Sequence, residues 1–442
     1  MTIRMDEGAA ELLDTLHRAG YAAYVVGGCV RDSLMGLTPH DWDLCTSALP
    51  QQGMELFGAE KCIPTGLQHG TVTVKQGGGL YEITTFRTEG AYTDGRHPDE
   101  VHFVPDVRED LARRDFTINA MAYNAKEGLI DPFGGQADLQ SGVLRAVGVP
   151  HQRFTEDALR ILRLYRFAAR FGFSIDPPTA QAAQELCAHL DCVSVERIEE
   201  ELAKLLSAPA PAAYLNEKIL SVVLPELSPE ALAAAKPVVD ACPAGERALP
   251  VRLAALLLSL GEDGTRRTLR RLRCSNACIE ETAVLVREVV SGVPGAFSSD
   301  TNRAIPSPAL LPAATGSHPS GRSSEKLPAR PPVSLNIYTR KLLGQYGLKT
   351  VQRLAALGTA LQPEHAADFA ALSELAEQLD ADGVCCRVSQ LAVNGRDLMA
   401  AGVPAGPGIR KVLEALLDGV IREEYPNERQ ALLAAVQQLA AS

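Results

Sequence analysis

The stretch between residues 24 and 43 constrains this chain more than any other part of the sequence. An apolar run leads into the glycine pair Gly27 and Gly28, and the stretch ends with Asp41 and Asp43 on either side of a tryptophan. This pattern predicts a short buried strand, a tight turn, the start of a helix and a second strand. Because alternate residues of a strand point the same way, Asp41 and Asp43 are expected to project together from one face.

Two carboxylates at this spacing suit a hard divalent cation, and magnesium is the expected ion. The glycine turn lets backbone amides approach an anionic group, and the start of the following helix, with Arg31 in its first turn, favours negative charge. A triphosphate beside magnesium fits both features. An isolated Asp-x-Asp pair is commonly solvated and an isolated Gly-Gly is commonly a tight turn, so the interpretation depends on their order along the chain.

Residues 26–32 and 41–48 resemble the head of class II CCA-adding enzymes, which are tRNA nucleotidyltransferases. Cys29 stands where alanine or glycine is common in that family, which is a small departure. Bacterial poly(A) polymerases belong to the same larger superfamily. The resemblance implies an α+β protein in which an N-terminal nucleotidyltransferase head, with a mixed β-sheet and helices, is followed by an all-α neck, body and tail.

The expected domains follow the motifs and the composition. Apolar spacing is helical after the head, and one later segment is rich in Pro, Ser, Gly and Ala. The only His-Asp dipeptide lies inside the head motif, so no HD phosphohydrolase activity is expected. The expected boundaries are a catalytic head at 1–145, a base-recognising neck at 146–210, a helical body without an HD motif at 211–291, a disordered insertion at 292–334 and a tRNA-binding tail at 335–442.

Three further segments of the head are similar to the family. Glu82 lies in a strand-like run that resembles the family's third-carboxylate strand, although an ordinary exposed glutamate is the alternative. Residues 94–98 resemble the flexible loop of enzymes that can add the terminal adenosine. Residues 113–120 match the family's next motif, and the resemblance assigns Arg114 to the nucleotide phosphates. A guanidinium fork suits phosphate oxygens better than an ammonium group does.

A second motif-bearing helix is predicted after Phe154. Thr155 is a suitable N-cap, and Glu156 and Asp157 would occupy the first turn, where the helix dipole favours acids. Helical spacing gives this helix an apolar face and an opposite cationic face, with Asp157 at the border. The cationic face carries Arg153, Arg160, Arg163, Arg166 and Arg170.

Residues 156–160 match the Glu-Asp-x-x-Arg motif of class II CCA-adding enzymes. The resemblance implies that Asp157 and Arg160 hydrogen-bond the incoming base in place of a template, with Arg163 and Arg166 in support. Cytosine and adenine carry an exocyclic amino group that a carboxylate accepts from, and an arginine donates to ring acceptors, whereas uracil and guanine present the opposite pattern. An Asp–Arg pair that only stabilises a helix surface is the alternative.

The resemblance implies template-independent addition of C, C and A to the 3′ end of tRNA from CTP and ATP, with release of pyrophosphate. Asp41 and Asp43 would hold two magnesium ions, with Glu82 as the third catalytic carboxylate. The residues that would seat the triphosphate are Gly28, Arg31 and Arg114. The alternatives are a poly(A) polymerase, an enzyme that adds only the terminal A, and a non-catalytic RNA-binding module.

Composition limits the partners. The net charge of −11 argues against a generally cationic nucleic-acid binder, but residues 153–170 and 266–273 each hold five arginines that could contact phosphates or form a solvated helix face. The ten cysteines form no Cys-x-x-Cys pair and are expected to be reduced, and no apolar run has transmembrane length. We expect tRNA, CTP and ATP as partners, without a membrane or DNA, and a cytoplasmic monomer or homodimer.

Overall fold

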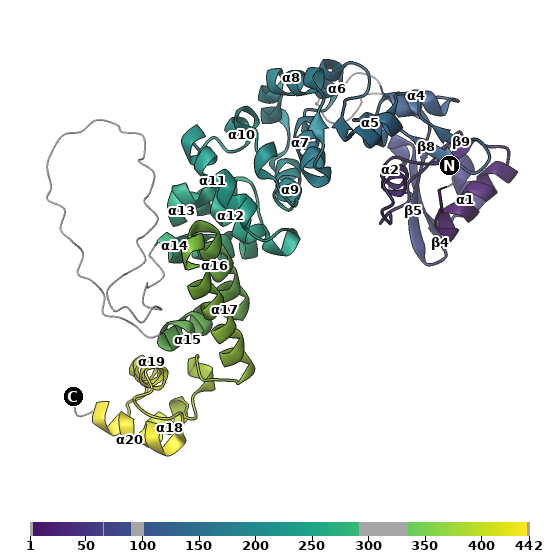
Figure 1. The fold of residues 1–442 in the computed structure, drawn as a ribbon. Helices are drawn as coiled ribbons and strands as arrows, with labels where there is room; N and C mark the ends of the chain where they lie inside the picture. The colour runs from purple at the N-terminus through teal and green to yellow at the C-terminus, as the bar shows by residue number, and fades with distance from the viewer. Residues whose placement is uncertain (1–2, 65, 90–100, 291–334, 440–442) are drawn as a thin grey trace. The chain divides into compact units, whose positions relative to one another are not determined.

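The computed structural model describes residues 3–64, 66–89, 101–290 and 335–439 (Figure 1). The chain divides into two compact units, Met1–Pro225 and Glu226–Ser442. The first unit contains the β-sheet, and the described part of the second unit is helical. The predicted α+β class, with a sheet-bearing head followed by helices, is confirmed. The predicted insertion at 292–334 falls outside the described residues.

A seven-stranded mixed sheet lies at the centre of the first unit, in the order β3-β4-β5-β2-β1-β8-β9. β2 and β5 run parallel, and the other neighbouring pairs are antiparallel. Its strands are β1 (Ala23–Val26), β2 (Leu44–Thr46), β3 (Cys62–Ile63), β4 (Thr71–Gln76), β5 (Gly79–Thr85), β8 (Ala122–Asn124) and β9 (Gly128–Ile130). Two smaller pairs are β6 (Arg87–Glu89) with β7 (Val101–Phe103) and β10 (Val143–Leu144) with β11 (Ser174–Ile175).

The helices of the first unit surround this sheet and continue beyond it. They are α1 (Glu7–Arg18), α2 (Gly28–Leu34), α3 (Pro50–Phe57), α4 (Val107–Ala112), α5 (Gly135–Ser141), α6 (Pro150–Glu156), α7 (Leu159–Phe171), α8 (Pro177–Glu185), α9 (Val195–Leu206) and α10 (Glu217–Val223). Short 3₁₀ turns are η1 (Leu67–His69), η2 (Thr117–Asn119), η3 (Cys187–Cys192) and η4 (Ala212–Tyr214).

Strand β1 is buried on both faces, as its uninterrupted apolar sequence predicts. Ala23 and Val25 join an apolar cluster that includes the buried leucines of α1. Tyr24 and Val26 join the cluster on the other face, to which α4 contributes. The strand that leads into the glycine turn is therefore fixed by packing from both sides, which gives the turn a rigid base.

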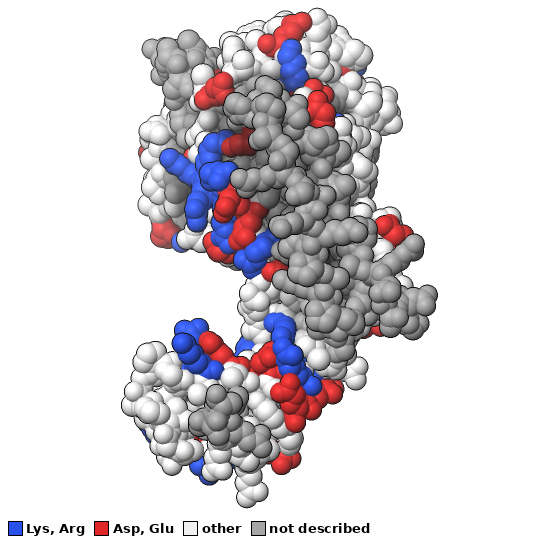
Figure 2. Space-filling view, turned by 90° about the vertical axis from the view of Figure 1, so that its left-hand side faces the viewer, with Lys and Arg blue, Asp and Glu red and all other residues white. Residues whose placement is uncertain are grey.

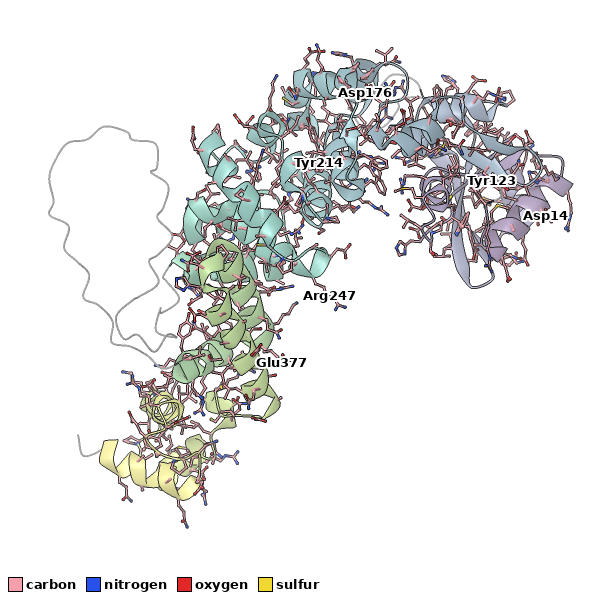
Figure 3. The ribbon with its side chains drawn as sticks, viewed as in Figure 1. Asp14, Tyr123, Asp176, Tyr214, Arg247 and Glu377 are labelled. Carbon is pink, nitrogen blue, oxygen red and sulfur yellow. The ribbon has the colours of Figure 1, made fainter. Side chains whose placement is uncertain are left out.

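The helical part of the first unit is joined to the sheet-bearing part by polar contacts. Figure 3 labels Asp176, which precedes α8, and Tyr214 of η4, which lies within the helical part. The Asp176 carboxylate accepts from the Thr179 backbone amide at 3.2 Å, which caps α8, and it also pairs with Arg145 next to β10. The Tyr214 hydroxyl donates to the Phe173 carbonyl at 3.1 Å. Together with the β10–β11 pairing, the Asp176–Arg145 contact fastens α8 and the end of α7 to the sheet-bearing part.

The described part of the second unit is helical. Its helices are α11 (Pro229–Ala241), α12 (Leu249–Leu257), α13 (Gly261–Arg271), α14 (Asn276–Val290), α15 (Leu335–Tyr346), α16 (Leu348–Leu361), α17 (Ala366–Ala381), α18 (Gly395–Ala400), α19 (Gly408–Ile421) and α20 (Arg429–Leu439). Its 3₁₀ turns are η5 (Glu246–Ala248), η6 (Leu258–Leu260), η7 (Pro363–His365) and η8 (Val388–Gln390). Within the described ranges, no helix combines the length and the apolar character that a membrane crossing needs.

The arginine cluster at 266–273 is partly neutralised by its surroundings. Arg266 pairs with Glu262 at 3.0 Å and also with Glu280, and Arg271 pairs with Glu226 at 2.7 Å. On the face shown in Figure 2, basic and acidic side chains likewise lie intermixed. At least two of the five arginines are thus held by carboxylates, so the cluster offers less free positive charge than its sequence indicates.

Candidate active site

The glycine turn lies between β1 and α2. Gly27 has φ +80°, and its amide donates to the Met121 carbonyl at 3.0 Å. A Cβ atom at Gly27 would lie only 2.8 Å from Nη1 of Arg114, whereas one at Gly28 would meet Nη2 of Arg31 at an ordinary 3.6 Å. The backbone conformation of Gly27 favours glycine, and any side chain there would also force the Arg114 guanidinium to move.

Replacing Gly27 with alanine should displace Arg114. Gly20→Ala is the matched control, because Gly20 also has positive φ (+89°) but has no atom within 4 Å of an added Cβ. Both variants are expected to lose about 1–3 kcal/mol of stability through backbone strain. Only Gly27→Ala should also lower kcat/KM for CTP, by about tenfold, in a steady-state incorporation assay. Equal activity of the two variants would contradict a role for this contact.

The structure corrects one expectation about Asp41 and Asp43, because both residues precede β2 instead of lying within it. The antiparallel register that pairs Val25 with Leu44 would pair Asp41 with Gly28, where β1 has already given way to α2. The ladder therefore cannot extend as far as Asp41. The chain stays extended up to β2, since the Val26 amide donates to the Asp43 carbonyl at 2.9 Å.

The predicted alternation of side-chain direction along residues 41–43 is nevertheless observed. Asp41 and Asp43 are both exposed, while the intervening Trp42 is partly buried against the apolar cluster under α1. On the parallel neighbour β5, Ile83 pairs with Leu44, so Glu82 lies one position earlier, at the level of Asp43. The structure thus brings the three predicted carboxylates to one edge of the sheet.

The electrostatic surroundings of Asp43 support this grouping. Crowding by protein atoms raises the pKa of Asp43, the positive charge of Arg114 lowers it, and the negative charges of Glu82 and Asp41 raise it further. Arg114 offsets only part of this repulsion among three carboxylates, and like charges gathered in this way favour binding of a cation. Arg114 itself pairs with Asp110 at 3.5 Å, so it stands between that carboxylate and the acidic edge.

The donor chemistry of this edge fits a divalent metal ion. In the described parts of the chain, no group of three or more His, Cys, Asp or Glu side chains converges closely enough to form a complete protein cage for a metal. Magnesium is commonly bound by only one or two carboxylates, with water and substrate phosphates completing its shell. Asp41 and Asp43 meet that requirement, and their role as ligands stays a prediction.

Arg31 lies next to the glycine turn, but its guanidinium is engaged within the protein. It is 4% exposed, donates from Nε to Asp32 at 2.8 Å and from Nη1 to Asn119 at 2.5 Å, and packs over Phe171 with 4.9 Å to the ring centroid. The described geometry therefore gives the Arg31 side chain a structural position, and direct contact with a triphosphate stays a prediction.

The neck helix differs from its predicted form. Thr155 and Glu156 belong to the end of α6, Asp157 follows that helix with φ −143°, and α7 begins only at Leu159. The Asp157 carboxylate accepts from the Leu159 amide at 3.0 Å and from Arg197 of α9 at 2.8 Å. Asp157 therefore lies in a break between two helices, because its side chain satisfies an amide at the start of the second one.

Arg160 is held beside this break. Its Nη1 donates to the Glu156 carboxylate at 2.7 Å and to the Arg153 carbonyl at 3.1 Å, and Nη2 donates to the Arg113 carbonyl at 3.1 Å. Three of the five guanidinium N–H groups are thus used by described residues. The arrangement fixes the direction of the guanidinium and leaves Nε–H and one Nη2 hydrogen for another acceptor.

Arg163 and Arg166 of α7 do not lie on an open cationic face, because both are paired with carboxylates of the protein. Arg163 donates from Nε and Nη2 to Asp115 at 3.0 and 2.7 Å, and Arg166 is buried and pairs with Glu201 of α9 at 2.5 Å. Burial alone would raise the pKa of Asp115, but the positive charge of Arg163 and the Asn119 amide hold it well below its usual range. Arg163 and Arg166 therefore belong to an internal network of paired charges, while Arg170 at the end of α7 stays partly exposed, 3.6 Å from Asp32.

Sequence reasoning missed the partners in this network. Asp115 and Asn119 lie in the motif that supplied Arg114, and their type and spacing alone gave no sign that they face each other. Arg197 and Glu201 lie four residues apart on α9, so they share one helix face. The four-residue spacing of Arg197 and Glu201 is the signal in the sequence that could have indicated partners for the charged residues around α7.

Known proteins are similar to this chain in sequence over nearly its whole length. Residues 23–145 match the family model described as Poly A polymerase head domain, and residues 336–436 match tRNA nucleotidyltransferase domain 2. A CCA-adding enzyme of Lactiplantibacillus plantarum is 36% identical over 435 residues, which is 97% of this chain and 95% of that protein. A CCA-adding enzyme of Geobacillus thermodenitrificans is 35% identical, over 96% of this chain and 95% of that protein.

Solved structures are similar in fold. The crystal structure of Bacillus stearothermophilus CCA-adding enzyme in complex with CTP gives a TM-score of 0.77 at 29% identity, covering 99% of this chain and 98% of that one. Thermotoga maritima CCA-adding enzyme complexed with tRNA gives a TM-score of 0.62 at 20% identity, covering 98% of this chain and 94% of that one. At that lower identity the likeness supports the fold alone.

Proposed function

This chain belongs to the CCA-adding enzyme family, as its motifs predicted, and we propose on that premise that it adds C, C and A to the 3′ end of tRNA from CTP and ATP. The observation that carries the proposal is the grouping of Asp41, Asp43 and Glu82 at the sheet edge, beside Arg114 and the glycine turn. Paired carboxylates next to a phosphate-binding guanidinium are what nucleotidyl transfer needs.

In this proposal the tRNA 3′-hydroxyl attacks the α-phosphate, and pyrophosphate leaves. Arg114 binds the triphosphate, and Gly28, which can add no side chain to the turn, leaves room for it. A divalent ion held by Asp41 and Asp43, for which we propose magnesium, supplies activation of the hydroxyl and stabilisation of the leaving oxygens when bound. Arg31 stabilises the glycine turn through its hydrogen bonds to Asp32 and Asn119.

The break between α6 and α7 reads the base. Each Asp157 oxygen accepts one hydrogen bond from the protein, which leaves a lone pair for an exocyclic amino group. Arg160 keeps unused N–H groups for a ring acceptor, and Arg163 and Arg166 hold α7 in place. Cytosine and adenine satisfy this donor and acceptor pattern, and uracil and guanine do not.

Incorporation of labelled nucleotides into a tRNA that lacks its CCA end tests the proposal. The full-length protein should add two C residues and then one A, and should release pyrophosphate in step. Omission of divalent ions should abolish addition. Failure to use CTP would refute the proposal.

A poly(A) polymerase is the second candidate, because the family model that matches residues 23–145 carries that description. Such an enzyme, or one that adds only the terminal A, would incorporate A without any need for CTP. The same assay with ATP alone separates the candidates. A CCA-adding enzyme should stop after one A on a tRNA that already ends in CC, whereas a poly(A) polymerase should continue.

A further inference from the structure

Four buried polar residues join the head to α7 beneath the glycine turn. Arg31 and Asp32 belong to α2, Asn119 ends η2, and Asp115 lies between α4 and η2. Their exposed fractions are 4%, 7%, 6% and 9%, respectively. Burying charged side chains costs desolvation free energy unless each charge is paired with good geometry. The hydrogen bonds that connect these four residues are therefore expected to be important for the structure.

Asn119 is the central connection. Its Oδ1 accepts from Nη1 of Arg31 at 2.5 Å, and its Nδ2 donates to Oδ1 of Asp115 at 3.0 Å. A guanidinium can only donate and a carboxylate can only accept, so the two neighbours require an acceptor and a donor from one short side chain. Asparagine provides both. An aspartate would place a second negative charge against Asp115, and a leucine would leave both neighbours without this partner.

Both ends of the connection lead to α7. Asp115 accepts two hydrogen bonds from Arg163 through its other oxygen, Oδ2. At the opposite end, the Arg31 guanidinium packs over Phe167 and Phe171 of α7, at 5.3 and 4.9 Å from the ring centroids. Asn119 therefore lies at the middle of a closed set of contacts that begins and ends on the helix that follows the base-reading break.

We propose that Asn119 is a positioning residue, which sets the placement of α7, and with it Asp157 and Arg160, relative to the carboxylates at the sheet edge. The inference rests on the proposed function. One nucleotide must be held by the head at its phosphates and by the α6–α7 break at its base. A displacement between the two of about 1 Å is enough to lower the rate by about a hundredfold. The value of kcat/KM should fall most for CTP and ATP, because only cytosine and adenine use the aligned hydrogen bonds to Asp157 and Arg160.

The test compares Asn119→Leu with Asn124→Leu. Asn124 of β8 is fully buried, donates to the Ala23 carbonyl at 3.1 Å and accepts from the Glu127 amide at 2.7 Å, all within the head. Each variant removes a buried amide, so both should have a lower melting temperature. Asn119→Leu should lower the ratio of kcat/KM for CTP to that for UTP by about tenfold or more. Asn124→Leu should leave this ratio within about twofold of the parent value.

Asn119→Asp keeps the test decisive if Asn119→Leu does not fold. It preserves size and the acceptor for Arg31 but replaces the donor toward Asp115 with a like charge, so it should also reduce the CTP-to-UTP ratio. An unchanged ratio in the folded Asn119 variants would overturn the inference. A parent protein that fails to incorporate C would instead refute the proposed function, so the two failures are distinguishable.

Discussion

Replacement of Asp41 or Asp43 with asparagine is expected to lower kcat/KM for CTP addition by about a thousandfold. Each change keeps the size of the side chain and removes the negative charge that would hold the metal ion. Because both residues are exposed and Asp43 lies among other acids, the melting temperature should not fall. Loss of activity without loss of stability is typical of a site in which function requires gathered like charges.

Asp14→Asn is the matched control for this prediction. Asp14 lies on α1 of the same unit (Figure 3), is well exposed, and pairs only with Arg18 at 3.3 Å among the described residues. Its replacement should leave CTP addition within about twofold, since exposed ion pairs contribute little. If the double variant Asp41→Asn, Asp43→Asn incorporated CTP at the parent rate, the metal assignment would be wrong. Titration with magnesium should show whether the single variants need a higher concentration.

The strand, turn and helix around Gly27 could be predicted because local signals specify each of them. The apolar run of β1 packs on both faces, and the glycine pair breaks the strand at the predicted place. The start of β2 only at Leu44, after both aspartates, could not be predicted in this way. It depends on where the partner strand β1 stops, and pairing between segments leaves no trace in local periodicity.

The neck shows more clearly that contacts between distant segments cannot be predicted from local sequence patterns. The apolar positions of α7 are buried as predicted, but the Asp157 carboxylate in the break is also held by Arg197, forty positions later. The predicted cationic face is likewise neutralised by Asp115 and Glu201 from two other segments. Sequence showed which side chains carry charge. It could not show which of them are paired, because pairing depends on tertiary contacts.

The Asp157 carboxylate should decide which base is accepted, and Asp157→Ala is expected to lose discrimination against UTP and GTP. A well-placed pair of hydrogen bonds to a base is worth about 1–3 kcal/mol, so the ratio of kcat/KM for CTP to that for UTP should fall by about ten- to a hundredfold. Competition between labelled CTP and unlabelled UTP on a tRNA lacking its CCA end measures this ratio directly.

Two companion variants separate base reading from local structure. Arg197→Met keeps Asp157 but removes the 2.8 Å contact that holds its carboxylate, so it should weaken selectivity less than Asp157→Ala does. Glu185→Ala removes an exposed carboxylate of α8 that pairs with His151, and it should change neither selectivity nor rate. Because the Leu159 amide also depends on Asp157, some loss of stability is expected in Asp157→Ala. Selectivity retained in that variant would exclude a template role for Asp157 and leave only its role at the start of α7.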